Sequence, residues 1–266
     1  MSIAPRTLIN FPTIEALPAD LMRGRGNVSV RALARARWVL RRKGDGRWLA
    51  VVGRGRLIGL APGALRAALG RMDEAEVLAR LDAPARTPGV LSLAPLRAML
   101  ADLGIQADYG RARGLARVAE PAVLAFAGFD RYRRPLWLTD ATARAWAMMR
   151  SAALAEGVAL EAISGYRSHA YQLGIFRRKL RRGQRLDAIL AVNAAPGYSE
   201  HHSGRALDIG TPGEPPAEES FELTPAFAWL LRNAARFGFS MSYPRDNPHG
   251  IVYEPWHWCN GARPAR

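Results

Sequence analysis

The sequence predicts an α+β fold: a small antiparallel sheet flanked by helices, preceded by a smaller mixed α/β N-terminal domain. Three observations favour this fold class. Helical patterns and short strand-like runs follow one another without the regular alternation that a parallel sheet requires. The chain has 266 residues, enough for one large domain or two modest ones. Apolar residues make up 49% of it, which is sufficient for a packed core.

The N-terminal third predicts strands followed by helices. Residues 38–60 contain short apolar runs broken by Gly-Asp-Gly and Gly-Arg-Gly, which predicts a hairpin or a three-stranded meander. Residues 61–81 and 91–105 carry helical spacing, and Gly104 fits a helix C-terminal cap. These residues form no motif that assigns a function to the region.

A domain boundary is expected between residues 107 and 121, where Gly, Arg and Pro are frequent. It separates an N-terminal domain, residues 1–120, of unknown role, from a C-terminal domain, residues 121–266. In the second domain, helical patterns cover residues 138–157, 168–183, 186–195 and 224–239. Strand patterns cover residues 158–168, 205–210 and 251–258.

The chain is strongly basic, with 38 basic residues and a formal net charge of +15. Only Lys43 and Lys179 are lysines, so the arginine content is weak support for any particular ligand. The densest basic cluster, Arg177 to Arg185, fits either a polyanion-binding patch or a solvated helix face, and the second interpretation is favoured. Because no nucleic-acid-binding motif accompanies the cluster, we expect no nucleic-acid partner.

Compartment is only weakly constrained by the sequence. No apolar run reaches the roughly 18 residues of a transmembrane span, so no transmembrane segment is expected. The first residues lack a basic start followed by a continuous apolar stretch, so no secretory signal is visible. The expectation is a cytoplasmic protein or a periplasmic or cell-envelope protein whose leader has been trimmed. A single cysteine, Cys259, excludes an intramolecular disulfide.

Groups able to bind a metal are concentrated in two short segments. The chain has five histidines, and three of them lie close to carboxylates in these segments. The donors are His201, His202, Asp208, Glu254 and His257. Taken singly, each residue is weak evidence for a metal site. A lone strand histidine is more often a polar residue with its hydrogen bonds satisfied than a metal ligand, and an Asp before Ile-Gly is usually a turn residue.

The order of these residues is more specific than any single one. The first segment reads Ser199-x-His201-x-x-Gly204-x-Ala206-x-Asp208, the second reads Glu-Pro-Trp-His from residue 254, and upstream lies SGYRSHAYQ from residue 164. With all three blocks in order, the chain resembles the VanY-like D-alanyl-D-alanine carboxypeptidases, zinc peptidases of the fold shared with lysostaphin and hedgehog domains. The resemblance covers roughly residues 125 to 260.

The resemblance implies a zinc site in a cleft and assigns roles to individual residues. His201, Asp208 and His257 would bind one zinc ion per chain. Glu254 would be the general base and acid, and Arg167 would hold the scissile carbonyl. These roles suit peptide hydrolysis, which needs a non-ligand carboxylate to move the proton and a fixed positive charge where the oxyanion develops.

The same resemblance suggests residues that contact the substrate. Ser199 and Gln172 would lie near the terminal carboxylate of the peptide, and Tyr166 would line the pocket. The other two histidines, His169 and His249, are expected at the surface or behind the site.

Strand geometry adds two expectations about the ligands. Ala206 and Asp208 share one face of a strand whose other face carries apolar residues, so Asp208 should point into the cleft. His201 matches the family position of the ligand, whereas His202 is expected behind the ligands or at the surface. Glu254 and His257 are three residues apart, so the chain must bend or bulge between them for both to reach the metal.

The predicted function is that of a zinc metallopeptidase, a carboxypeptidase that removes a C-terminal D-alanine from peptidoglycan stem peptides or their precursors. Its specificity could be for the D,D bond or the L,D bond. Two alternatives stay open: a peptidoglycan endopeptidase of the same fold, and a noncatalytic module that binds the cell wall. In each case the expected partner is peptidoglycan or its peptide stems.

Overall fold

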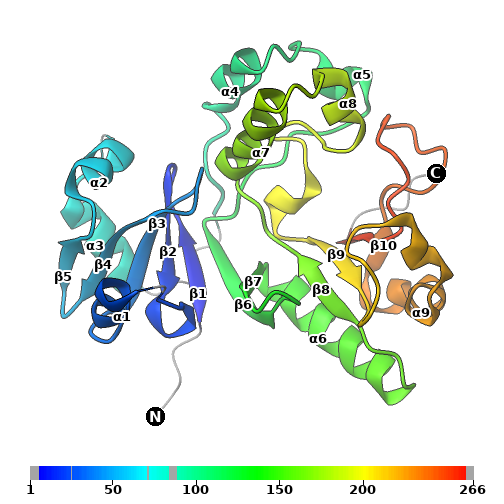
Figure 1. Ribbon diagram of the computed structural model, residues 1–266, viewed down its shortest axis with the longest axis horizontal. Coiled ribbons are helices and arrows are strands. Elements are labelled where there is room, and N and C mark those ends of the chain that lie inside the picture. The colour runs from blue at the N-terminus through cyan, green and yellow to red at the C-terminus, as the bar shows by residue number, and fades with distance from the viewer. Residues whose placement is uncertain (1–5, 25, 71, 84–88, 262–266) are drawn as a thin grey trace.

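The computed structural model describes residues 6–24, 26–70, 72–83 and 89–261. Among these residues, no helix is long and apolar enough to cross a membrane. Two antiparallel sheets organise the chain, and helices flank them (Figure 1). The predicted α+β fold class is confirmed.

The larger sheet has seven strands in the order β5-β4-β3-β2-β1-β6-β7, with every pairing antiparallel. Its strands are β1 (Thr7–Asn10), β2 (Ile14–Pro18), β3 (Trp38–Arg42), β4 (Trp48–Gly53), β5 (Arg56–Gly59), β6 (Val123–Phe129) and β7 (Pro135–Leu138). The three-stranded meander predicted over residues 38–60 is therefore present as β3, β4 and β5.

Strands from both predicted domains form this one sheet. β1 pairs with β6, with Thr7 opposite Ala125 and Ile9 opposite Val123. β6 and β7 come from the C-terminal side of the expected boundary, so backbone hydrogen bonds join the two sides. The division near residue 120 stays a prediction.

The smaller sheet carries the candidate site. It has four antiparallel strands in the order β10-β11-β9-β8. These are β8 (Glu161–Ser164), β9 (Ala206–Gly210), β10 (Phe239–Met241) and β11 (His257–Asn260). The strand predicted over residues 251–258 is wrong in its extent, because residues 251–256 form a loop and turn and the strand begins only at His257.

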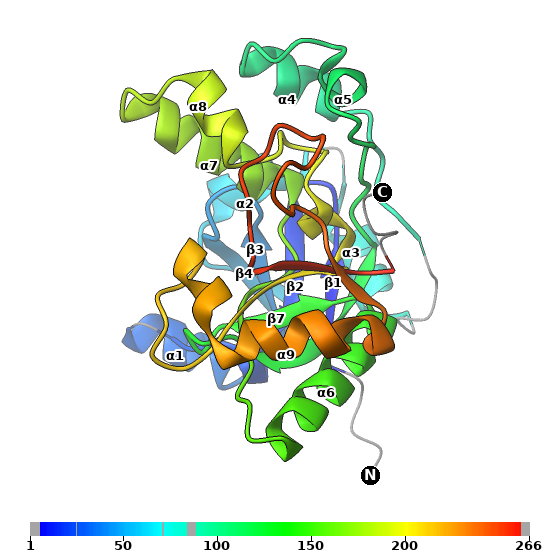
Figure 2. The same ribbon diagram turned by 90° about the vertical axis from the view of Figure 1, so that its right-hand side faces the viewer.

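Helices cover the sheets on two sides (Figures 1 and 2). α4 (Leu96–Asp102), α5 (Tyr109–Ala112), α7 (His169–Arg181) and α8 (Leu186–Ala191) lie together at one end, where they share an apolar core. At the opposite side lie α6 (Asp140–Ala155) and α9 (Pro225–Asn233), and α9 runs on into the short helix η4 (Ala234–Phe237). Near the N-terminal strands lie α1 (Asn27–Leu33), α2 (Pro62–Leu69) and α3 (Glu74–Asp82).

Most predicted helices are confirmed, with shifted ends. The helical pattern over residues 61–81 becomes two helices, α2 and α3, because Gly70 adopts a positive φ of 62° after α2. The pattern over residues 91–105 yields only the short α4. Gly104 follows this helix with a φ of 70°, as its predicted capping role requires.

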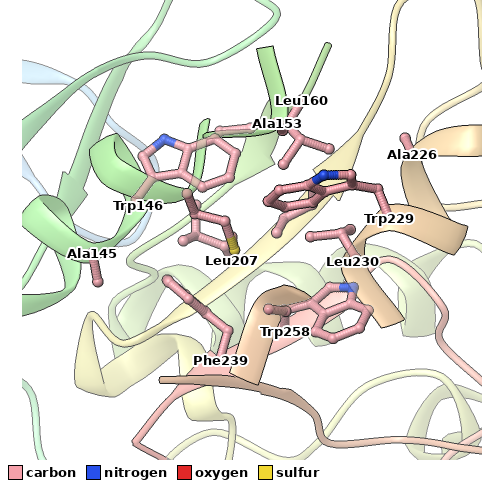
Figure 3. Packing of buried hydrophobic residues seen from close by; sticks show 14 of the residues in the cluster. Ala145, Trp146, Ala153, Leu160, Leu207, Ala226, Trp229, Leu230, Phe239 and Trp258 are labelled. Carbon is pink, nitrogen blue, oxygen red and sulfur yellow. The ribbon is translucent and has the colours of Figure 1, made fainter. Parts of the chain in front are cut away.

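The core beneath the smaller sheet fixes the direction of β9. Leu207 and Ile209 are fully buried and pack in a cluster with aromatic side chains of α6 and α9, among them Trp146 and Trp229 (Figure 3). Burial of each such aliphatic side chain stabilises the fold by about 1.5–3 kcal/mol. Because side chains alternate along a strand, this anchoring turns Asp208 to the opposite face, as predicted.

Candidate active site

Seven of the eight predicted site residues lie together in one cleft. The cleft has a volume of about 310 Å³ and opens beside β9 and β11. The predicted residues that line it are Arg167, Gln172, Ser199, His201, Asp208, Glu254 and His257. Its wall also includes Lys179 of α7 and Tyr243, two side chains that the sequence motifs do not indicate.

The three predicted metal ligands converge. One donor atom from each of His201, Asp208 and His257 lies within 4.8 Å of the other two, and all three residues are buried. Asp208 of β9 stands directly opposite His257 of β11 in the antiparallel register. His201 comes from the short helix η2 (Glu200–Ser203), which precedes β9. Adjacent strands and one tight helical turn therefore present the three side chains at one point.

Hydrogen bonds fix the tautomers that a metal site requires. The Nδ1–H of His201 donates to the carbonyl oxygen of Gly165 at 2.8 Å, so its Nε2 carries the lone pair and lies 3.3 Å from Asp208 Oδ1. The Nε2–H of His257 donates to Glu200 Oε2 at 2.9 Å, so its Nδ1 faces Asp208 Oδ1 at 3.1 Å. Both metal-facing nitrogens thus point at the same carboxylate, and their outer nitrogens are held by acceptors, as in carboxylate–histidine–metal arrangements.

Two imidazoles and one carboxylate form a ligand set typical of catalytic zinc, which leaves a further coordination position for water or substrate. The residues present therefore fit the predicted metal. Glu200 contributes to this fit, although the motifs gave it no role. Its only sequence signal is its place directly before His201, and its partner His257 lies 57 positions away along the chain.

The titration of these groups reflects their close packing. Burial raises the pKa of Asp208, but His201 and His257 outweigh burial and hold this pKa well below its usual range. Burial lowers the pKa of His257, yet hydrogen bonds to Asp208 and Glu200 outweigh it and raise this pKa to about 10. The metal-free site therefore holds a proton on His257 at neutral pH, between two carboxylates.

Glu254 occupies the position expected of a general base. Its Oε2 lies 4.0 Å from His257 Nδ1, so it borders the ligand group without being one of the three. Burial, assisted by Asp208 and Glu200, raises the pKa of Glu254 to about 7 against the opposing effects of His257 and Arg167. A carboxyl that titrates near neutral pH can both accept and return a proton.

The expected break between Glu254 and His257 is present as a turn. Pro255 and Trp256 form it, and the His257 amide donates to the Glu254 carbonyl at 3.0 Å. The Glu254 amide is held in turn by the carbonyl oxygen of Tyr243. This turn places both side chains in the cleft and leads directly into β11.

Arg167 is fixed through both its side chain and its backbone. Its Nη1 donates to Gln172 Oε1 at 2.9 Å, and its Nη2 lies 3.9 Å from Asp208 Oδ2. Its amide donates to the carbonyl oxygen of His201, and its own carbonyl accepts from the Nδ1–H of His202 at 2.6 Å. His202 is fully buried behind the site, and its Nε2 accepts from the amide of Gly197.

Tyr166 is the predicted site residue that the structure does not bring into the cleft. Its side chain is not among those that line the cleft. The hydroxyl instead donates to Glu120 Oε2 at 2.5 Å and lies 3.2 Å from Asn10 Oδ1, both outside the matched motifs. The expectation that Tyr166 lines the pocket is corrected accordingly, since these partners draw it toward the N-terminal strands.

The remaining polar residues divide between surface and interior. His249 is half-buried and its Nδ1 meets the carbonyl oxygen of Arg113 at 2.8 Å. His169 is buried, so for this residue the surface alternative is wrong. In the basic cluster, Arg177 is exposed and pairs with Asp102, whereas Lys179 is half-buried in the cleft wall. Burial and the nearby Arg167 lower the pKa of Lys179.

Comparisons with known proteins identify the C-terminal region. Residues 135–261 match the family model VanY, D-alanyl-D-alanine carboxypeptidase. A putative carboxypeptidase of Bacillus subtilis, YodJ, is 36% identical over 48% of this chain and 48% of its own length. A D-alanyl-D-alanine carboxypeptidase of Enterococcus faecium is 38% identical over 35% of this chain and 27% of its own. The chain therefore spans about half or less of these relatives.

Solved structures of similar proteins include the LD-carboxypeptidase LdcB. It is 35% identical over 47% of this chain and 60% of its own, with a TM-score of 0.44. A VanY D,D-pentapeptidase variant solved with Zn(II) is 29% identical over 48% of this chain and 74% of its own, with a TM-score of 0.41. The family match covers residues 135–261, just under half of the chain, and these residues are similar to the VanY D-alanyl-D-alanine carboxypeptidases.

Proposed function

We propose that the protein is a zinc-dependent carboxypeptidase that hydrolyses the bond to a C-terminal D-alanine in peptidoglycan stem peptides or their precursors. The observation that carries the proposal is the convergence of His201, Asp208 and His257 beside a carboxyl, Glu254, that is not one of the three ligands. The family match of residues 135–261 supports the same reaction class.

Zinc held by the three ligands would supply Lewis-acid polarisation of the substrate carbonyl and would acidify a water molecule. Glu254 takes a proton from the attacking water at its carboxylate and delivers it to the departing amine. Arg167 places its guanidinium against the carbonyl oxygen, where negative charge develops during attack. Gln172 holds that guanidinium from one side through its Oε1, while its own amide donates to the carbonyl oxygen of Ala194 at 2.8 Å.

The charge of the cleft wall favours a substrate with a free carboxylate. Arg167 and Lys179 both line the cleft, close enough for Arg167 to lower the pKa of Lys179. A peptide that ends in a carboxylate offers a partner for this second cation, whereas an internal peptide segment does not. Ser199 lies in the same wall and can donate a hydrogen bond to that carboxylate. The wall therefore supports a carboxypeptidase over an endopeptidase.

The experiment that tests this function is mass spectrometry of products from tri-, tetra- and pentapeptide stems, with zinc-loaded and chelator-treated protein. We expect loss of one C-terminal alanine by the zinc-loaded protein alone. Cleavage of the pentapeptide indicates D,D-specificity, and cleavage of the tetrapeptide indicates L,D-specificity. Internal cleavage would point to the endopeptidase, and bound zinc without any product to a noncatalytic wall-binding module.

Addition of zinc to the metal-free protein at pH 7 is expected to displace about one proton from His257. Its pKa of about 10 keeps the imidazole protonated at this pH, and a ligand nitrogen must be unprotonated. Apparent zinc affinity should therefore rise with pH up to about 10. Calorimetric titration in two buffers of different ionisation enthalpy measures the displaced proton. Identical heats in both buffers would contradict the expectation.

A further inference from the structure

A buried polar cluster outside the cleft joins the N-terminal strands to the segment that carries Arg167. Lys43 directly follows β3 and is only 1% exposed. Its ammonium lies 2.5 Å from Glu120 Oε2, and Glu120 is buried as well. Removal of two charges from water is costly, so a buried pair of this kind calls for an explanation beyond stability.

Glu120 accepts hydrogen bonds from residues on both sides of Arg167 in the chain. Its Oε2 accepts from the hydroxyl of Tyr166 at 2.5 Å, and its Oε1 accepts from the backbone amide of His169 at 2.8 Å. The carboxylate therefore takes donors from the residue just before Arg167 and from the start of α7. Lys43 supplies the opposite charge that keeps this carboxylate ionised, and it lowers the pKa of Glu120 against the effect of burial.

His169 connects this hydrogen-bonded cluster to His202, the neighbour of the ligand His201. Its Nε2–H donates to the carbonyl oxygen of Val118 at 2.7 Å, and its ring meets the ring of His202 edge-on at 4.4 Å. His202 in turn donates to the carbonyl oxygen of Arg167. Contacts therefore connect Glu120 to the residue before Arg167 and, through the rings of His169 and His202, to the Arg167 carbonyl oxygen.

The turn that carries Lys43 packs against α7 of the C-terminal half. The Lys43 amide donates to the carbonyl oxygen of Thr13 at 3.1 Å, which fixes the turn to the N-terminal sheet. The next residue, Gly44, approaches α7 closely: a Cβ added at Gly174 would lie 2.9 Å from the Gly44 carbonyl oxygen. Glycine at position 174 admits this contact, so the turn is packed against the helix that begins at His169.

We propose that Lys43 and Glu120 are positioning residues: together they fix the Tyr166–His169 segment and thereby hold the Arg167 guanidinium in the cleft. This assigns the N-terminal strands a part in the reaction. The proposal rests on the proposed function, in which Arg167 acts on the substrate carbonyl.

The test replaces Lys43 with methionine in the full-length chain. Methionine keeps the length of the buried side chain and removes its charge, so Glu120 loses its cation and its hold on the segment weakens. We expect kcat for the D-alanine-terminated peptide to fall about 10- to 100-fold, since small displacements of a positioned group have effects of this size. KM should change less than about threefold and zinc content should be unchanged, because the interaction is made chiefly in the transition state.

Arg41→Met is the matched control. Arg41 Nη2 pairs with the buried carboxylate of Glu15 at 2.6 Å within the N-terminal sheet. Glu15 is near enough to Tyr166 to raise its pKa, but it accepts its hydrogen bond from Arg41 and not from the Tyr166–His169 segment. The Arg41→Met change also leaves a buried carboxylate, Glu15, without its cation. Both variants should therefore have a lower melting temperature than the wild type. Only Lys43→Met should lower kcat. Equal losses of kcat in the two variants would overturn the proposal, because they would indicate general destabilisation.

Amide hydrogen exchange keeps this test separate from the proposed function. Peptides that cover residues 166–172 should exchange faster in Lys43→Met and not in Arg41→Met, whether or not the wild-type protein cleaves any peptide. The proposal is overturned if exchange in Lys43→Met is unchanged. It is also overturned if exchange is faster but the kcat of an active Lys43→Met protein equals that of the wild type. If Lys43→Met does not fold, Tyr166→Phe decides: it keeps the ion pair, removes one donor to Glu120, and should lower kcat in the same direction by a smaller factor.

Discussion

Replacement of Glu254 by glutamine is expected to lower kcat by about two to four orders of magnitude while zinc content and fold remain. Glutamine is nearly isosteric, but it cannot accept the proton of the attacking water, and a positioned general base contributes roughly this factor. Because Glu254 is not among the three converging ligands, the metal should stay bound. Steady-state kinetics on a D-alanine-terminated peptide, with the zinc content of each sample, measures the effect.

Glu200→Gln is the control for this variant, since it makes the same chemical change at a carboxyl that contacts the same histidine, His257. Glu200 accepts a hydrogen bond from His257 rather than bordering the substrate, so its loss should weaken zinc affinity about 10- to 100-fold. Saturating zinc should restore activity to Glu200→Gln and leave Glu254→Gln inactive. A near-normal rate in Glu254→Gln would show that another group serves as the base.

Replacement of His201 by alanine is expected to abolish stable zinc binding, and with it turnover, whereas His202→Ala should retain most of the metal. His201 offers a bare Nε2 to the ligand group, while both ring nitrogens of His202 are engaged by backbone groups. Elemental analysis of the dialysed variants measures bound zinc. Loss of zinc in His202→Ala with retention in His201→Ala would reverse the assignment of the ligand.

The two neighbouring histidines should also differ in how they lose activity. His202→Ala removes the donor to the Arg167 carbonyl, so kcat should fall even in protein with its full complement of zinc. In His201→Ala, any residual activity should rise with added metal. Differential scanning calorimetry of both variants separates these effects from unfolding.

The metal ligands were predicted through the resemblance of three ordered motifs to the VanY-like family, and local patterns explain how Asp208, Glu254 and His257 reach the cleft. The burial of Leu207 and Ile209 turns Asp208 into the cleft, and the turn at Pro255 brings Glu254 and His257 to the same side. These are consequences of strand alternation and of proline chemistry, which act over a few residues. The C-terminal helices were likewise visible in their spacing.

Residues whose position depends on distant partners were missed or misplaced. Tyr166 lies inside a matched motif, yet its hydroxyl is drawn out of the pocket by Glu120. Glu200 acts on a histidine from a different strand, and Lys179 reaches the cleft because only one face of α7 turns inward. Such pairings join elements that are far apart in the chain, and no spacing rule expresses them. The extent of the last strand failed for a related reason, because its apolar residues serve the cleft wall and not a ladder.

The shared seven-stranded sheet determines how the chain can be divided. β6 pairs with β1 along one edge and with β7 along the other. A fragment trimmed to begin near residue 121 would expose the outer edge of β6, whose sequence VLAFAGF contains neither charge nor proline. An uncovered, apolar edge of this kind invites pairing with a second copy and is a recognised route to aggregation. Pairing with the N-terminal strand Thr7–Asn10 covers this edge of β6 in the full chain.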